Sequence, residues 1–160
     1  MPDSIILKLG LLILITPFML YGISQLTPGI NGFIVQSGSM EPEIMTGSVL
    51  FTKATNPDKI QEGDTITYKD GDIHTTHKVI NKETSENQTT FKTKGIANKA
   101  ADPGRINAEQ VVGKKIFSIP YLGYIITLTG TKFAKIALIV VPATLLAGIE
   151  LKELIQEIKE

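Results

Sequence analysis

The stretch Asp64–Ile80, DTITYKDGDIHTTHKVI, holds two runs of alternating polar and apolar residues, separated by Asp70-Gly71. Alternation with a period of two is typical of half-buried β-strands, and Asp-Gly between two such runs favours a tight hairpin turn. Further short strand-like runs occur at residues 32–35, 48–53, 89–94 and 111–118. We therefore predict a mainly β domain, a small barrel or sandwich, over residues 27–131.

The chain is strongly apolar before this domain. Residues 5–26 carry one charge, Lys8, and about 20 apolar residues cross a hydrocarbon core of roughly 30 Å. We predict that residues 1–26 form an N-terminal transmembrane anchor, in which Pro17 is tolerated. The alternative is a cleaved signal peptide, because Gly22 and Ser24 are small residues at a spacing suited to cleavage.

A second apolar run occupies residues 133–149. It is short for a membrane span, so an interfacial helix and a buried core helix are alternatives to the span that we favour. In the tail, residues 150–160, apolar side chains recur three and four positions apart, which predicts an amphipathic helix. We predict that residues 132–160 form a C-terminal transmembrane helix with this short tail, which places both termini on one side of the membrane.

The composition excludes several classes of protein. The 160 residues include 16 Lys plus Arg and 16 Asp plus Glu, so no basic surface for nucleic acid is expected. There is no cysteine, which excludes disulfides, iron–sulfur clusters and thiolate zinc sites. The two histidines, His74 and His77, lie three apart on a predicted strand and should face opposite sides. We expect no metal, no cofactor and no nucleic-acid partner.

The segment Ser37-Gly38-Ser39 follows an apolar strand and offers two hydroxyls beside a flexible glycine. Such a turn can supply both a nucleophile and an oxyanion pocket. Taken alone, this segment is better explained as an ordinary Ser/Gly loop after the apolar helix. His77 could serve as a general base, although a single histidine in a strand is more often structural.

Four segments in order resemble the type I signal peptidases, in particular the eukaryotic and archaeal (endoplasmic-reticulum-type) branch. Residues 37–42, Ser-Gly-Ser-Met-Glu-Pro, resemble that branch's nucleophile motif close behind an apolar helix. His77-Lys78-Val79 resembles its His-Arg-Val box, and Thr93–Asn98 with Asp102-Pro103 resembles its Lys-Gly-Asp-x-Asn…Asp box. Residues 111–114 and 119–124 resemble the segment that closes the catalytic domain. The resemblance runs from about residue 5 to residue 124.

The resemblance implies a membrane-bound serine endopeptidase that removes signal peptides from exported preproteins and cleaves after small residues. It implies Ser39 as the nucleophile, His77 as the general base and Asp102 as the partner of the imidazole. The Ser37 hydroxyl and the Ser39 backbone N–H would form the oxyanion pocket. Met40, with Ile34 or Val35, would line the pockets for small substrate side chains.

Two departures from the family pattern matter. Ile96 stands where an acid is usual, so Asp102 is the only carboxylate candidate from its segment. Ser48 follows Gly47 where Asp is common, and we expect a structural role for it. Lys78 lies one residue beyond His77, so its side chain should point away from Ser39.

Partners and location also follow from the resemblance. It implies exported preproteins, the lipid bilayer and the protein translocation machinery as partners. The catalytic domain would lie on the extracytoplasmic side of the cell membrane, or of the endoplasmic reticulum membrane in a eukaryote. The competing hypothesis is a non-enzymatic membrane-anchored β module, an adhesin or an assembly scaffold, in which Ser39, His77 and Asp102 need not meet.

Overall fold

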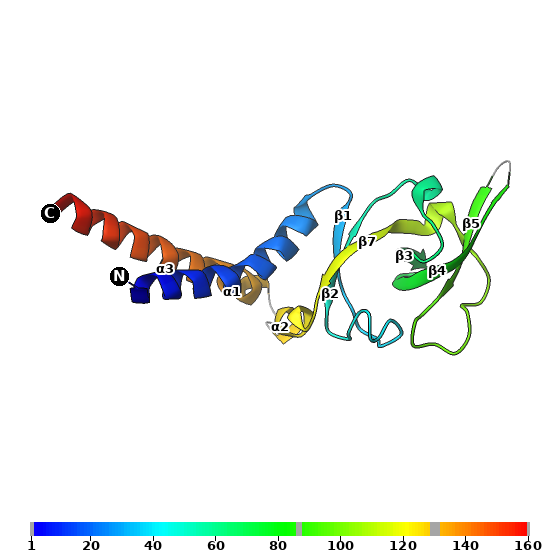
Figure 1. The fold of residues 1–160 in the computed structure, drawn as a ribbon, viewed down its shortest axis with the longest axis horizontal. Coiled ribbons are helices and arrows are strands. Elements are labelled where there is room, and N and C mark those ends of the chain that lie inside the picture. Colours follow the sequence, from blue (N-terminus) through cyan, green and yellow to red (C-terminus); the bar gives the residue numbers. More distant parts are fainter. Residues whose placement is uncertain (1, 86–87, 129–131, 160) are drawn as a thin grey trace. The chain divides into compact units, whose positions relative to one another are not determined.

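The fold combines a β-sheet with long helices that precede and follow it (Figure 1). A computed structural model describes residues 2–85, 88–128 and 132–159. In chain order the elements are α1 (Pro2–Leu26), β1 (Ile30–Ile34), β2 (Val49–Lys53), the 3₁₀ helix η1 (Pro57–Lys59), β3 (Thr65–Asp70), β4 (Ile73–Ser85), β5 (Gln88–Lys94), β6 (Ile106–Asn107), the 3₁₀ helix η2 (Ala108–Gln110), β7 (Val111–Ile119), α2 (Leu122–Leu128) and α3 (Lys132–Lys159).

The strands form one sheet in the order β1-β2-β7-β3-β4-β5-β6. Every neighbouring pair within the described residues is antiparallel. The prediction of a mainly β domain is therefore confirmed. Each predicted strand is present within a few residues of its expected bounds, whereas β6 and α2 were not predicted.

The β3–β4 hairpin forms where Asp70-Gly71 predicted it. Asp70 pairs with Ile73, and Gly71 has a φ of 59°, the left-handed conformation that glycine adopts without steric cost. β4 then runs beyond its predicted end to pair with β5, and the register shifts between Val79 and Asn81. This bulge lies three residues after His77, the candidate base.

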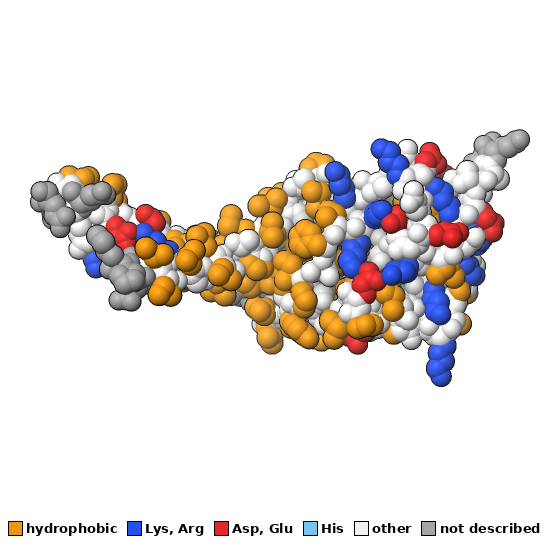
Figure 2. All heavy atoms as spheres, in the orientation of Figure 1, with side chains coloured by type: hydrophobic (Ala, Val, Ile, Leu, Met, Phe, Trp, Pro, Cys, Tyr) orange, Lys and Arg blue, Asp and Glu red, His pale blue; other side chains and the backbone are white. Residues whose placement is uncertain are grey.

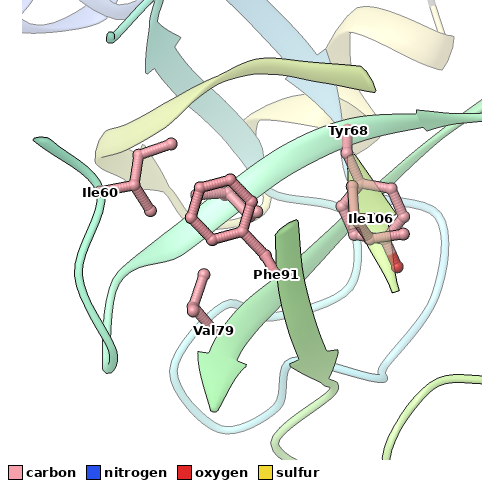
Figure 3. Close-up of a cluster of buried hydrophobic side chains, with 6 residues drawn as sticks. Ile60, Tyr68, Val79, Phe91 and Ile106 are labelled. Atoms are coloured by element: carbon pink, nitrogen blue, oxygen red, sulfur yellow. The ribbon is translucent and has the colours of Figure 1, made fainter. Parts of the chain in front are cut away.

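A buried apolar cluster draws its side chains from β3, β4, β5, β6 and the chain after η1 (Figure 3). Phe91 lies among aliphatic side chains from neighbouring strands and from the loop after η1, and Val111 packs against the cluster. Tyr68 lies at the edge of this cluster with its hydroxyl on the side away from Phe91. The buried members are Ile60, Ile66, Tyr68, Val79, Phe91 and Ile106.

The chain separates into two compact units, Ser24–Tyr124 and a unit made of Met1–Ile23 with Ile125–Glu160. The boundary that we predicted after residue 131 falls next to residues 129–131, which lie outside the described residues. Charged side chains gather on the sheet unit, and hydrophobic side chains cover most of the visible surface of the helices (Figure 2).

Within the described residues, Ile5–Leu26 of α1 is the one helical segment long and apolar enough to cross a membrane. α3 joins the predicted second apolar run and the amphipathic tail in a single helix. The apolar side chains of the tail, Leu151, Leu154, Ile155 and Ile158, are exposed. That α3 crosses the membrane stays a prediction.

Candidate active site

Ser39 lies in the loop that connects β1 to β2. The two ends of this loop are held together because Val35 N–H donates to the Ser48 carbonyl at 2.9 Å and Gly47 N–H donates to the Val35 carbonyl at 2.8 Å. Inside the loop, the Glu41 carboxylate accepts from both the backbone N–H and the hydroxyl of Thr46. These two hydrogen bonds, the one from the Thr46 N–H having the larger effect, hold the pKa of Glu41 below its usual value.

Apolar side chains anchor the same loop to the sheet. Met40 and Ile44 are buried with Leu50, and Val35 and Ile96 pack against them. Met40 directly follows Ser39, so burial of its side chain fixes the backbone that carries the nucleophile candidate. Ile96, which replaces the acid usual in the family, therefore has a packing role beneath the loop.

The turn after β5 also holds Ser39. Ala97 N–H donates to the Ser39 carbonyl at 2.9 Å. A Cβ on Gly95 would lie 2.7 Å from that carbonyl oxygen and 2.7 Å from Asn98 Nδ2, so the close approach requires glycine. The turn that leads to Asp102 thus also positions the backbone of Ser39.

His77 connects Ser39 to Asp102. It lies on β4 opposite Ile66 of β3, and only 7% of it is exposed. Its Nε2 lies 3.1 Å from Ser39 Oγ, and its Nδ1 lies 2.6 Å from Asp102 Oδ2. In the neutral tautomer with the proton on Nδ1, the ring donates to Asp102 and accepts from the Ser39 hydroxyl. The structure therefore brings together the three side chains that the sequence predicted.

Asp102 is held as a carboxylate. Its backbone N–H donates to the Thr93 carbonyl at 2.9 Å, and the Thr93 hydroxyl donates to Oδ2 at 2.7 Å. Burial opposes ionisation, but the hydrogen bonds from Thr93, His77 and Tyr68 outweigh it and hold the pKa of Asp102 below its usual value. The group beside His77 is thus negatively charged at neutral pH.

Glu43 ties the Ser39 loop to two strands. Its carboxylate accepts from Lys78 Nζ of β4 at 2.7 Å and from Lys115 Nζ of β7 at 2.9 Å. The hydrogen bonds from the two ammonium groups, that of Lys78 having the larger effect, hold the pKa of Glu43 below its usual value. Lys78 is therefore engaged by Glu43, while the adjacent His77 contacts Ser39.

A groove of about 600 Å³ opens beside these side chains. Met40, Ile34 and Val35, which we expected to line pockets for small side chains, all border it. Ser37 is an exposed residue of the wall, and its hydroxyl has no hydrogen-bond partner among the described residues. The other lining residues are Phe33, Gln36, Ser39, Ile44, Ile73, His74, Thr75, Thr76, His77 and Asn98.

Two neighbours of the site were not predicted, the hydroxyls of Tyr68 and Thr93. Thr93 stands directly before Lys94-Gly95 in a segment that carries the family resemblance, which is the signal that could have identified it. Tyr68 could have been found from the hairpin register, since Ile66, two residues earlier, pairs with His77. Among the described residues, no cluster of three or more His, Asp or Glu side chains could hold a metal ion.

A serine hydroxyl, an imidazole and a carboxylate joined in sequence by hydrogen bonds match the arrangement found in serine hydrolases. No protein-family model matches the chain. It is 37% identical over 89 residues to signal peptidase I W of Bacillus subtilis, covering 52% of this chain and 47% of the relative. It is 33% identical over 129 residues to the signal peptidase complex catalytic subunit SEC11 of Verticillium alfalfae, covering 71% of this chain and 73% of the relative. The human catalytic subunit SEC11C is 33% identical over 102 residues, and the match covers 53% of it.

The chain belongs to the type I signal peptidases, in the branch that includes the SEC11 catalytic subunits. It spans about three quarters of the fungal relative and about half of the Bacillus and human proteins.

Proposed function

We propose that this protein is a membrane-bound serine endopeptidase that removes N-terminal signal peptides from exported preproteins and cleaves after small residues. Family membership supports this activity. The observation that carries it is the position of His77, within hydrogen-bond distance of both Ser39 Oγ and Asp102 Oδ2.

In the proposed reaction, Ser39 Oγ attacks the scissile carbonyl while His77 Nε2 takes its proton. His77 then returns the proton to the leaving amine, and Asp102 stabilises the imidazolium between the two steps. The Ser39 N–H and the Ser37 hydroxyl would donate to the developing oxyanion. Each such donor is typically worth about 3 kcal/mol of the barrier.

The proposed substrate is an extended peptide in the groove. The apolar wall formed by Ile34, Val35 and Met40 suits small uncharged side chains near the cleaved bond. Ser39 lies 13 residues after Leu26, the end of the apolar helix, and this stretch spans at most roughly 45 Å when fully extended. A substrate whose own apolar helix lies in the bilayer is therefore within reach.

We propose that α1 anchors the chain in the cell membrane, or in the endoplasmic reticulum membrane of a eukaryote, with the sheet unit on the extracytoplasmic side. The SEC11 relatives are by name subunits of a signal peptidase complex. By analogy, we propose that this chain acts beside the translocation machinery. We also propose α3 as a second membrane helix.

The competing hypothesis, a non-enzymatic β module, is not supported. It would be favoured by a separation of more than about 8 Å between Ser39 Oγ and the His77 ring, too long for proton transfer. The observed distance from Oγ to Nε2 is 3.1 Å.

The test is cleavage of a preprotein by the full chain in detergent, comparing wild type, Ser39→Ala and Ser118→Ala. Ser118 lies on β7 and does not border the groove, so its variant controls for loss of a serine. We expect Ser39→Ala to lose activity by about a thousandfold or more and Ser118→Ala to remain active. Cleavage by Ser39→Ala at the wild-type rate would contradict the proposal.

A further inference from the structure

Three hydrogen-bond donors converge on a single oxygen of Asp102. His77 Nδ1 lies 2.6 Å from Oδ2, Thr93 Oγ1 lies 2.7 Å from it and Tyr68 Oη lies 3.2 Å from it. Within the described part of the chain, no donor reaches Oδ1. The imidazole therefore shares its acceptor atom with two hydroxyls.

Both hydroxyls belong to side chains that are buried in the sheet unit. Thr93 on β5 is 1% exposed and Tyr68 on β3 is 2% exposed. Thr93 holds Asp102 twice, through its own carbonyl and its hydroxyl. Burial, assisted by the negative charge of Asp102, raises the pKa of Tyr68 to about 12. Both groups consequently remain neutral donors across the range in which a histidine titrates.

Donors on a carboxylate weaken its hold on a neighbouring cation. Each hydrogen bond to Oδ2 withdraws part of the charge that would otherwise stabilise the imidazolium of His77. Removing a donor should therefore let His77 bind its proton more tightly. An imidazole that is protonated at a higher pH stops acting as a base at a higher pH.

We propose that Tyr68 and Thr93 are positioning residues that set the low-pH limit of activity by sharing Asp102 Oδ2 with His77. Neither side chain borders the groove, so neither touches the substrate. Their hydroxyls act through Asp102; the Tyr68 ring also lies edge-on to the His77 ring, with 6.4 Å between the centroids, and Tyr68→Phe keeps that ring. The inference rests on the proposed serine peptidase function.

The first measurement is kcat/KM against pH for the full chain in detergent, comparing wild type with Tyr68→Phe and Thr93→Val. Thr89→Val is the matched control. Thr89 is a buried threonine of the same strand, β5, and its hydroxyl pairs with that of Thr84 and not with Asp102. We expect the acid limb to move to higher pH by about half a unit in each test variant, about a threefold change in proton affinity. KM should change little, and Thr89→Val should leave the acid limb in place.

The second measurement does not need activity. In a Ser39→Ala background, the two histidines are labelled with ¹³C at Cε1 and titrated by NMR, with His74→Ala to assign the signals. We expect Tyr68→Phe and Thr93→Val to move the His77 midpoint upward and to leave that of His74 unchanged. An unmoved or lowered His77 midpoint in both variants would overturn the inference. An inactive wild type would instead contradict the proposed function, and the titration would still report on the shared oxygen.

Discussion

His77 contacts both other members of the proposed triad, whereas His74 contacts neither. The His74 ring is exposed and lies 5.0 Å from the Phe33 ring, centroid to centroid. We expect His77→Ala to lower kcat by about a thousandfold or more, because the proton of Ser39 then has no acceptor. His74→Ala should keep kcat within about threefold of wild type, since its ring takes no part in proton transfer. Preprotein cleavage at saturating substrate measures both, and the reverse order would reassign the base.

Most residues of the proposed site could be predicted from the sequence. Ser39, His77 and Asp102 could be predicted because each lies in a short segment with a recognisable pattern, and the segments occur in the family's order. Tyr68 lies outside every such segment. Its hydroxyl reaches Asp102 only because β3 and β4 pair in one particular register, and a register is a property of two strands.

At the level of the elements, the loop between β1 and β2 is held against the sheet by ion pairs as well as by apolar packing. Glu43 of that loop bonds Lys78 of β4 and Lys115 of β7. Since its pKa is lowered in the folded state, its stabilising effect is present above the unfolded pKa, near 4.3, and disappears as pH falls through the folded value. After solvent screening of this partly exposed network, we expect Glu43→Gln to cost about 1 kcal/mol at pH 7.

The same substitution should cost little at a pH well below the lowered pKa of Glu43, where Glu43 is itself neutral. Urea unfolding of the full chain in detergent at both pH values checks this. Glu109→Gln is the control, because Glu109 forms no ion pair among the described residues. An equal loss of stability at both pH values would show that the effect is not electrostatic.

The strands were predictable where alternation extends over several residues, as in β3 and β4. β6 has two residues, Ile106 and Asn107, too few for any period to be visible, and it forms only because β5 offers a free edge. β4 has 13 residues, whereas the alternating run after Asp70-Gly71 that predicted it covers only residues 73–80, because the bulge interrupts the alternation after Val79.

For the molecule as a whole, the proposed site lies within one unit, and most of the proposed anchor, Met1–Ile23, lies within the other. Ile13 is near the middle of the apolar segment and 73% exposed, and Leu26 is at its end and 84% exposed. A charge at mid-span costs about 3 kcal/mol on insertion and far less at the interface. We therefore expect Ile13→Arg to lower the membrane-inserted fraction while Leu26→Arg does not.

Alkaline extraction of membranes measures the inserted fraction. Cleavage of a short soluble peptide in detergent should be alike for Ile13→Arg and Leu26→Arg, because neither residue contributes to the groove. Equal insertion of the two variants would contradict the proposed role of α1. The crossing of α3 could not be decided from sequence, because its apolar run is short and an interfacial or packed helix has the same composition.

The bulge between Val79 and Asn81 divides the β4–β5 hairpin into two parts with different evolutionary freedom. His77 and Thr93 lie in the part next to the proposed site. The paired residues 81–85 and 88–92 form an arm on the other side of the bulge. The inner part of the arm holds Phe91 of the buried cluster, so only its outer end, beyond Thr89, is free of the core. Because the bulge already absorbs a change of register, homologues can lengthen this outer end without turning His77 away from its neighbours. The outer end is accordingly where insertions, tags or recognition segments could be accommodated without loss of the proposed peptidase activity.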